Sequence, residues 1–260
     1  MKAFTRKVLI LSTIGLLVPM IATAAETEER SRSFGIALDI DNHVQTYIEN
    51  NENYRGQIFF QYRGEKFNMD KDSASYRFFD RDKFQVEVIA KVPERGHGFA
   101  DETTITGMDE RESSLGLGLR VGYKTAIGLL SLDATKDISN QHDGAEADLR
   151  FGPDFYSERA GKARNVEFGV IGGVKWQSDK TVDYYYGVKD TETTADRAAY
   201  EGKAAITPYV GVAGQGNITK NLTFNTSAIY MDAPDEITDS PIVDKGHDVQ
   251  VSAGLTYWFR

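Results

Sequence analysis

The side chains of this chain that are best suited to proton transfer are its histidines. There are four of them, His43, His97, His142 and His247. Two are followed directly by an aspartate, as His142-Asp143 and His247-Asp248. A His-Asp pair serves a hydrolase only together with an activated serine at hydrogen-bonding distance and an oxyanion hole, and no serine stands out in that role. We therefore expect no catalytic residue and no enzyme.

Two pairs of acidic residues are candidates for a calcium site. One pair is Asp70 and Asp72, and the other is Asp101 and Glu102. Neither matches the Asp-x-Asp-x-Asp-Gly pattern of a calcium-binding loop. The chain has no cysteine, which excludes thiolate-bound metals and thiol nucleophiles. The glycines within 211–216 lie in an alternating segment and precede no helix, so they do not form a phosphate loop. We expect no metal and no cofactor.

Composition and charge narrow the classes of protein further. The chain has 260 residues, of which 40% are hydrophobic and 11% aromatic, so it has enough apolar surface to fold. Its formal net charge is -9. Binding to nucleic acid depends on Lys and Arg side chains that displace phosphate counterions, so a nucleic-acid partner is not expected.

The first residues have the pattern of an export signal. Basic residues at the start precede an apolar run over 8–21, and 22–24 then supply an Ala-Thr-Ala cleavage site. The run is shorter than the roughly 20 apolar residues of a membrane-spanning helix. We therefore expect a cleaved signal peptide over 1–24, a short N-terminal segment over 25–33 and a single folded domain over 34–260.

The remainder of the chain alternates apolar and polar residues with a period of two. The pattern is clearest over 115–124, 145–151, 166–176 and 249–259, where one face is apolar and the other is small or polar. Further candidate segments are 34–41, 54–64, 83–92, 127–137, 203–216 and 221–232. No 3.6-residue period is sustained, so the pattern predicts strands rather than helices.

Segment length and connection length favour a barrel that crosses a membrane. Several segments reach the roughly 9–11 residues that a tilted membrane-crossing strand needs. Long connections over 233–246, 177–202 and 93–111 alternate with short ones such as 217–220 and 124–126. Bacterial barrels have short periplasmic turns and longer extracellular loops. We predict an all-β fold, a transmembrane antiparallel up-and-down β-barrel of about 12 strands, with about 10 as the alternative.

Two segments fit this topology less well. Residues 153–163 form a rather long connection for the periplasmic side. Residues 182–188 lie in the long loop over 177–202, but they alternate and could form another strand.

The polar faces of the predicted strands carry charges of both signs. These are Arg120, Lys124, Glu146, Asp148, Arg150, Glu167 and Lys175. A Lys or Arg facing lipid at the bilayer midplane costs roughly 2–4 kcal/mol, so we expect these charges to face the lumen. About eight strands enclose packed side chains and about 16–18 enclose an aqueous channel. An intermediate barrel is therefore compatible with a salt-bridged plug or with a narrow pore.

Five short stretches stand in an order and spacing that can be compared with known families. They are Gly107-Met108-Asp109-Glu110, Tyr184-Tyr185-Tyr186-Gly187-Val188, Ala199-Tyr200-Glu201-Gly202, Asp239-Ser240-Pro241-Ile242-Val243 and Tyr257-Trp258-Phe259. Together they resemble the MltA-interacting protein / OmpV family of outer-membrane proteins. The resemblance implies a barrel in the outer membrane of a Gram-negative cell. Its partners there would be membrane lipid, lipopolysaccharide and the outer-membrane assembly machinery.

The resemblance also implies a non-catalytic function. Some members of the family are described as scaffolds that join a lytic transglycosylase to a murein synthase. Others are described as porin-like proteins in osmotic or antibiotic response. Our leading interpretation is a non-enzymatic scaffold or adaptor for murein enzymes, and a small porin-like channel is the alternative.

The C-terminal strand has the features of an assembly signal. Val251, Leu255, Tyr257 and Phe259 share its apolar face, and we expect them to guide insertion. The chain departs from the family pattern at Arg260, which follows the final aromatic residue.

Overall fold

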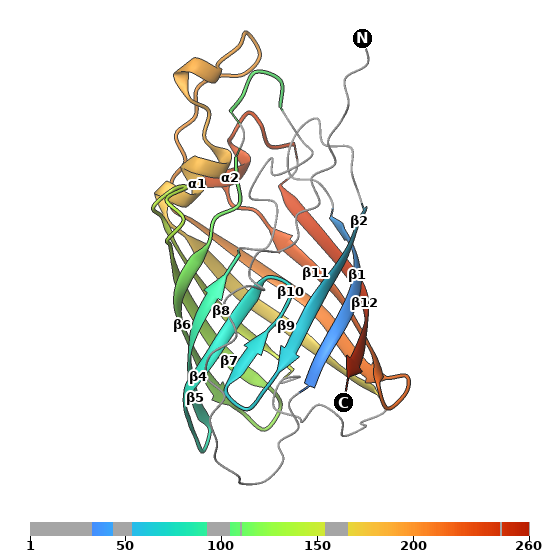
Figure 1. The fold of residues 1–260 in the computed structure, drawn as a ribbon. Helices are drawn as coiled ribbons and strands as arrows, with labels where there is room; N and C mark the ends of the chain where they lie inside the picture. The colour runs from blue at the N-terminus through green and yellow to red at the C-terminus, as the bar shows by residue number, and fades with distance from the viewer. Residues whose placement is uncertain are drawn as a thin grey trace. The chain divides into compact units, whose positions relative to one another are not determined.

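The computed structural model describes residues 33–43, 54–92, 105–109, 111–153, 166–244 and 246–259. Twelve strands, each antiparallel to its neighbours, form a closed barrel (Figure 1). The predicted all-β barrel and its larger strand number are thereby confirmed. The expected signal peptide lies outside the described residues.

Each strand pairs with its neighbours in sequence, and the first pairs with the last. The strands are β1 (Ser33–His43), β2 (Tyr54–Arg63), β3 (Phe67–Met69), β4 (Ser73–Arg81), β5 (Phe84–Lys91), β6 (Gly116–Lys124), β7 (Leu129–Asp137), β8 (Ala145–Gly152), β9 (Val166–Gln177), β10 (Ala205–Asn217), β11 (Leu222–Asp232) and β12 (His247–Phe259). Phe34 of β1 lies beside Phe259 of β12. A sheet closed in this way meets the requirement of a bilayer that backbone polar groups be paired within the protein.

The alternation did not reveal β3 and β4. In β4, the register against β5 shifts between Arg77 and Phe79, which marks a β-bulge. A bulge inserts one extra residue, so the apolar and polar positions change places beyond it and the period of two is interrupted. β3 has three residues, which is too short for any period to be recognised.

Alternate side chains of the strands differ in exposure. In β1, Ala37, Asp39 and Asp41 are buried, whereas Leu38 is 45% exposed and Ile40 is 51% exposed. Other exposed apolar side chains are Ile58, Phe60, Leu117, Leu119, Phe168, Val170, Val210 and Val212. Successive side chains of a barrel strand point inward and outward. The outer surface is therefore a broad apolar belt, which is stable only against an apolar medium such as lipid.

The long connections carry the helices of the structure. α1 (Asp179–Tyr186) and η2 (Asp190–Glu192) follow β9, and α2 (Asp235–Thr238) follows β11. α1 and α2 contact each other at one end of the barrel (Figure 1). Among the described residues, no helix is long and apolar enough to cross a membrane.

α1 shows that a strand over 182–188, our alternative, was wrong. Ser178 precedes the helix, and its side chain accepts a hydrogen bond from the N–H of Thr181, which caps the helix N-terminus. Val182 and Tyr185 are three residues apart and both buried, as expected for one face of a helix. A helix of eight residues is too short for its period to be told from alternation.

Candidate functional site

The long connections fold together at one end of the barrel into a compact unit. We call it the loop cap, and it comprises residues 105–109, 111–115, 178–204 and 233–244. Its core is made of Ile105, Met108, Val182, Tyr185, Tyr186, Val188, Ile237 and Ile242, together with Ala205 at the start of β10. These loops therefore have an apolar core of their own, separate from the outward-facing apolar belt of the strands.

Four of the five stretches that carry the family resemblance lie inside this cap, and the fifth ends β12. The Ser240 hydroxyl donates a hydrogen bond to the carbonyl of Tyr186 at 2.6 Å. The Tyr200 hydroxyl donates to the carbonyl of Glu236 at 2.9 Å. Residues far apart in sequence thus fix one another's backbone, so these stretches help to position the loops of the cap.

A buried ion pair joins the segment before β6 to the segment that follows α1. Arg111 donates from one nitrogen to both carboxylate oxygens of Glu192, at 3.1 and 2.9 Å, and each side chain is 3% exposed. Arg111 also donates to the carbonyls of Tyr184 and Asp109. Glu192 further accepts the N–H groups of Asp109 and Lys189. Sequence reasoning missed this pair, because nothing local links residues 81 positions apart.

The environment of Glu192 favours its charged form. Burial by itself raises the pKa of this carboxyl group. The hydrogen bond from Arg111, the backbone N–H groups of Lys189 and Asp109 and the positive charge of Arg111 outweigh burial and lower the pKa to about 2. Glu192 is therefore ionised at neutral pH, and the pair is a salt bridge.

Two tyrosines attach α1 to the segment that leads into β6. The Tyr184 hydroxyl accepts the N–H of Glu112 at 2.9 Å, and the Tyr185 hydroxyl accepts the N–H of Ser114 at 3.3 Å. Burial raises the pKa of Tyr184 and raises that of Tyr185 to about 12. Both phenols stay neutral at physiological pH, as expected for structural hydrogen-bonding groups.

A cleft of about 670 Å³ opens between α1, the segment that follows it and residues 199–201. Its walls include Arg111, Lys180, Asp183, Tyr184, Tyr200 and Glu201. The volume lies within the range of small-molecule binding sites, which is roughly 300–1,000 Å³. Sequence reasoning did not predict this cleft.

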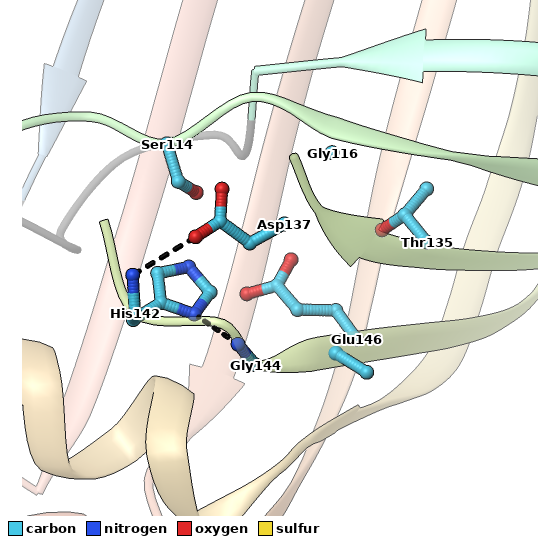
Figure 2. A pocket seen from close by; sticks show the side chains of 8 residues that line it. Ser114, Gly116, Thr135, Asp137, His142, Gly144 and Glu146 are labelled. Carbon is cyan, nitrogen blue, oxygen red and sulfur yellow. Dashed lines mark hydrogen bonds between the residues drawn. The ribbon is translucent and has the colours of Figure 1, made fainter. Parts of the chain in front are cut away.

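A much smaller pocket of about 10 Å³ is lined by side chains that include Ser114, Asp137, His142 and Glu146 (Figure 2). The Asp137 carboxylate accepts the backbone N–H of His142 at 2.9 Å, whereas His142 Nδ1 accepts the N–H of Gly144 at 2.9 Å. His142 Nε2 is buried and has no hydrogen-bond partner among the described groups. Asp137 thus does not orient the ring, and no serine–histidine–aspartate relay is formed by these residues.

The charge state of His142 follows from its surroundings. Burial lowers the pKa of the ring, and the nearby carboxylates of Asp137, Glu146 and Asp143 oppose that effect only in part. The imidazole is therefore neutral at pH 7, with Nδ1 acting as an acceptor. The pocket is about the size of one water molecule.

The other histidines and acidic residues that the sequence offered for catalysis or metal binding form no common site among the described residues. His247 stacks on Tyr230, with ring centroids 5.9 Å apart. Asp70 is paired with Arg63 at 2.7 Å. The His43 side chain, His97, Asp101 and Glu102 lie outside the part of the chain that can be described. Within the described ranges, no three His, Asp or Glu side chains are grouped so that they could hold a metal ion.

Several of the predicted lumen-facing charges take part in ion pairs or hydrogen bonds along the wall. Arg120 binds Asp133 at 2.6 Å and approaches Glu87 at 3.6 Å. Lys175 lies 3.8 Å from Glu146. Each of these pairs joins two adjacent strands, so these contacts run around the barrel and do not cross its centre.

The other predicted charges lie on β6, β8 and β9. Lys124 lies 3.5 Å from Asp80. Asp148 accepts a hydrogen bond from the Tyr209 hydroxyl at 2.8 Å, across the intervening strand β9. Arg150 lies opposite Ser131 and Gly173, and Glu167 lies opposite Gln215. On β12, the expected assembly residues are exposed on one face; they are Val251, Leu255, Tyr257 and Phe259.

The turn between β3 and β4 makes a further cluster that sequence reasoning missed. Lys71 Nζ lies 3.1 Å from a carboxylate oxygen of Asp39 and 3.1 Å from one of Asp41, both in β1. These carboxylates are buried, and Asp70 beside Lys71 is paired with Arg63 of β2. Ion pairs therefore connect the turn to β1 and β2. They supplement the short pairing of β2 with β3, which comprises only two residue pairs.

Comparison with known proteins agrees with this geometry. Residues 42–259 match the family described as MltA-interacting protein MipA. The outer membrane protein OmpV of Vibrio cholerae serotype O1 is 28% identical over 213 residues, which are 81% of this chain and 80% of that protein. The MltA-interacting protein of Escherichia coli K12 is 29% identical over 153 residues, or 58% of this chain and 59% of that protein.

Among solved structures, the KdgM porin is similar to this chain. It has a TM-score of 0.40 and 9% sequence identity, and the alignment covers 88% of this chain and 99% of that one. The Vibrio cholerae relative is named as an outer membrane protein, and the strands of this chain form a barrel with an apolar outer belt. This chain is an outer-membrane β-barrel that belongs to the MltA-interacting protein MipA family.

Proposed function

We propose that this protein is a non-enzymatic adaptor that binds murein-hydrolysing and murein-synthesising enzymes at the periplasmic face of the outer membrane. The observation that carries the proposal is membership of a family in which one relative is named for its interaction with MltA. The lack of a catalytic relay at His142 supports it, since a protein without its own chemistry can still act by holding enzymes together.

The short-turn end of the barrel offers the contact surface for this role. β12 ends there, and the turns at this end carry two exposed apolar tips. Ile127, between β6 and β7, is 83% exposed, and Ile218, between β10 and β11, is 55% exposed. Exposed apolar side chains on short, fixed turns are suited to partner contacts because little conformational entropy is lost when they bind.

Affinity capture tests the adaptor. Tagged barrel, extracted from cells in mild detergent, is expected to retain a murein hydrolase or synthase, identified by mass spectrometry. The double variant Ile127→Ser, Ile218→Ser should reduce that recovery. Ile138→Ser is the matched control, because Ile138 is 50% exposed but follows β7 at the opposite end of the barrel. Recovery of the barrel alone, or equal loss with the control, would count against the adaptor.

A second candidate function is a narrow channel. It is favoured by the arrangement of Arg120, Glu87 and Asp133, whose contacts follow the wall and leave the centre of the barrel uncrossed by these groups. Purified protein in planar bilayers should then give discrete conductance steps. Electrical silence at high protein input would remove the channel and leave the adaptor.

A further inference from the structure

The cleft of the loop cap is held open by its own framework. Val188 and Tyr200 exchange two backbone hydrogen bonds, at 2.8 and 3.0 Å, and so form a short antiparallel bridge. Gly202 donates its N–H to Asp183 Oδ1 at 2.8 Å, which fastens the same segment to α1. The walls are therefore fixed before any ligand arrives, and a preformed site avoids the entropy cost of ordering loops on binding.

The charged groups on the cleft walls leave an excess of carboxylates. Three cations and three carboxylates line it: Arg111, Lys180 and Lys189, and Asp183, Asp190 and Glu201. Arg111 is neutralised by buried Glu192, and Lys189 lies 2.8 Å from Asp109, so the lining carboxylates outnumber the remaining cation, Lys180. The cleft consequently gives a polyanion no net attraction and offers several acceptors for hydrogen bonds.

Tyr184 and Tyr200 also line the cleft, and their hydroxyls already form hydrogen bonds within the protein. The Tyr184 hydroxyl donates to Gln141 and accepts from the backbone of Glu112. The Tyr200 hydroxyl donates to the carbonyl of Glu236. The Tyr184 ring also contacts Arg111, His142 and Tyr185, and both rings pack in part against the core of the loop cap. What the two side chains offer a ligand is the ring surface that lines the cleft, which is apolar. The aliphatic lining is small, since only Val188 and Ala199 contribute to it.

A saccharide matches this combination of groups. Its hydroxyls can both donate to carboxylates and accept from ammonium groups, and its C–H faces can pack on tyrosine rings. A lipid chain would need a larger aliphatic lining, and a phosphate-rich ligand would need excess positive charge. We propose that the cleft between α1 and residues 199–201 binds a short saccharide, with Lys180 and Glu201 as polar contacts to the sugar hydroxyls. This site is independent of the adaptor function.

Titration of the purified full-length barrel tests the proposal. A zwitterionic detergent is needed, because alkyl maltosides carry a sugar headgroup. The probes are N,N′-diacetylchitobiose, which has the N-acetylated amino sugars of a murein-type glycan, and maltotriose, which is a plain glucan. Saturation-transfer NMR or calorimetry should detect binding of at least one probe, and preference for one of them identifies the source of the natural sugar.

Paired variants connect the binding to the cleft. Lys180→Gln with Glu201→Gln should weaken binding of the bound probe about tenfold or more, because charged hydrogen bonds are lost. Lys203→Gln with Asp196→Asn makes similar charge-neutralising changes at exposed cap positions outside the cleft and should leave binding unchanged. Heat-modifiable gel mobility checks that both variants are folded.

Three results would overturn the proposal. They are no binding of either sugar at millimolar concentration, binding that the Lys180 and Glu201 variant leaves intact, and saturable binding of spermine where neither sugar binds. None of these results affects the adaptor, which depends on the opposite end of the barrel.

Discussion

Arg111 and Glu192 lie 81 positions apart in the sequence and form an ion pair in which each side chain is 3% exposed. The pair joins the segment before β6 to the segment after α1. Removal of one partner from a buried pair leaves an uncompensated charge and costs about 3–5 kcal/mol. The loop cap therefore depends on this contact more than on any exposed ion pair, such as the one between Lys189 and Asp109.

The first prediction concerns the pH dependence of the cap. The pKa of Glu192 is lowered from 4.5 to about 2 in the folded protein. A carboxyl group with a lowered pKa contributes its full stability above its unfolded value and loses it as the pH falls through its folded value. The cap should become more sensitive to an acid-active protease between about pH 4.5 and pH 2.

The variant Glu192→Gln serves as the control for that titration. It should make the cap protease-sensitive already at neutral pH and should remove most of the acid-dependent change. An acid-dependent change of the same size in wild type and Glu192→Gln would show that other groups are responsible.

The second prediction concerns the close packing of Gly202 against α1. A Cβ atom at this position would overlap the backbone of Asp183. We expect Gly202→Ala to force the two segments apart, at a cost of about 1–3 kcal/mol for overpacking. Hydrogen exchange of the α1 amides should become faster. Gly246→Ala is the control, because the nearest atom to its Cβ would be 3.5 Å away. Unchanged exchange in Gly202→Ala would contradict this account.

The third prediction concerns the fastening of the turn between β3 and β4. Lys71→Gln leaves the buried carboxylates of Asp39 and Asp41 without their shared ammonium group, and we expect a loss of about 3 kcal/mol of stability. Urea unfolding in lipid vesicles measures it. The double variant Lys71→Gln, Asp39→Asn should recover part of the loss, whereas Lys203→Gln at an exposed cap position should have little effect. A fully additive double variant would argue against direct pairing.

The barrel itself could be predicted from the sequence because the bilayer imposes a local rule. Every lipid-facing position must be apolar, so strands such as β12 and β6 carry a regular period of two. β4 lost that period through its bulge, and β3 was too short to have one. The period of two can therefore be recognised in the sequence only where a strand is long and has no bulge.

The loop cap could not be predicted in the same way. Its contacts, such as that of Arg111 with Glu192, join residues far apart in sequence and follow no local period. Its helix α1 is short, and Val182, Tyr184 and Tyr186 alternate as a strand would. The stretches that carried the family resemblance did mark the right segments, but not how they meet.

The fourth prediction concerns assembly. Phe259 is 45% exposed at the end of β12, and its ring packs against those of Tyr257 and Phe34. Phe259→Ala should reduce the fraction of protein that reaches the membrane as a heat-modifiable barrel. Val170→Ala is the control, because it removes a lipid-facing side chain that is 62% exposed from a strand in the middle of the sequence. Equal folded fractions for Phe259→Ala and the control would contradict an assembly role.

Topology in the cell is the most direct test of the account as a whole. The chain has no cysteine, so single cysteines can be labelled without background. Lys203→Cys places an exposed thiol in the loop cap, and Lys83→Cys places one in the turn between β4 and β5 at the opposite end. With a membrane-impermeant maleimide, we expect Lys203→Cys to be labelled on intact cells and Lys83→Cys only after the outer membrane is permeabilised. Labelling of both on intact cells, or the reverse order, would contradict a membrane-spanning barrel with its loop cap outside.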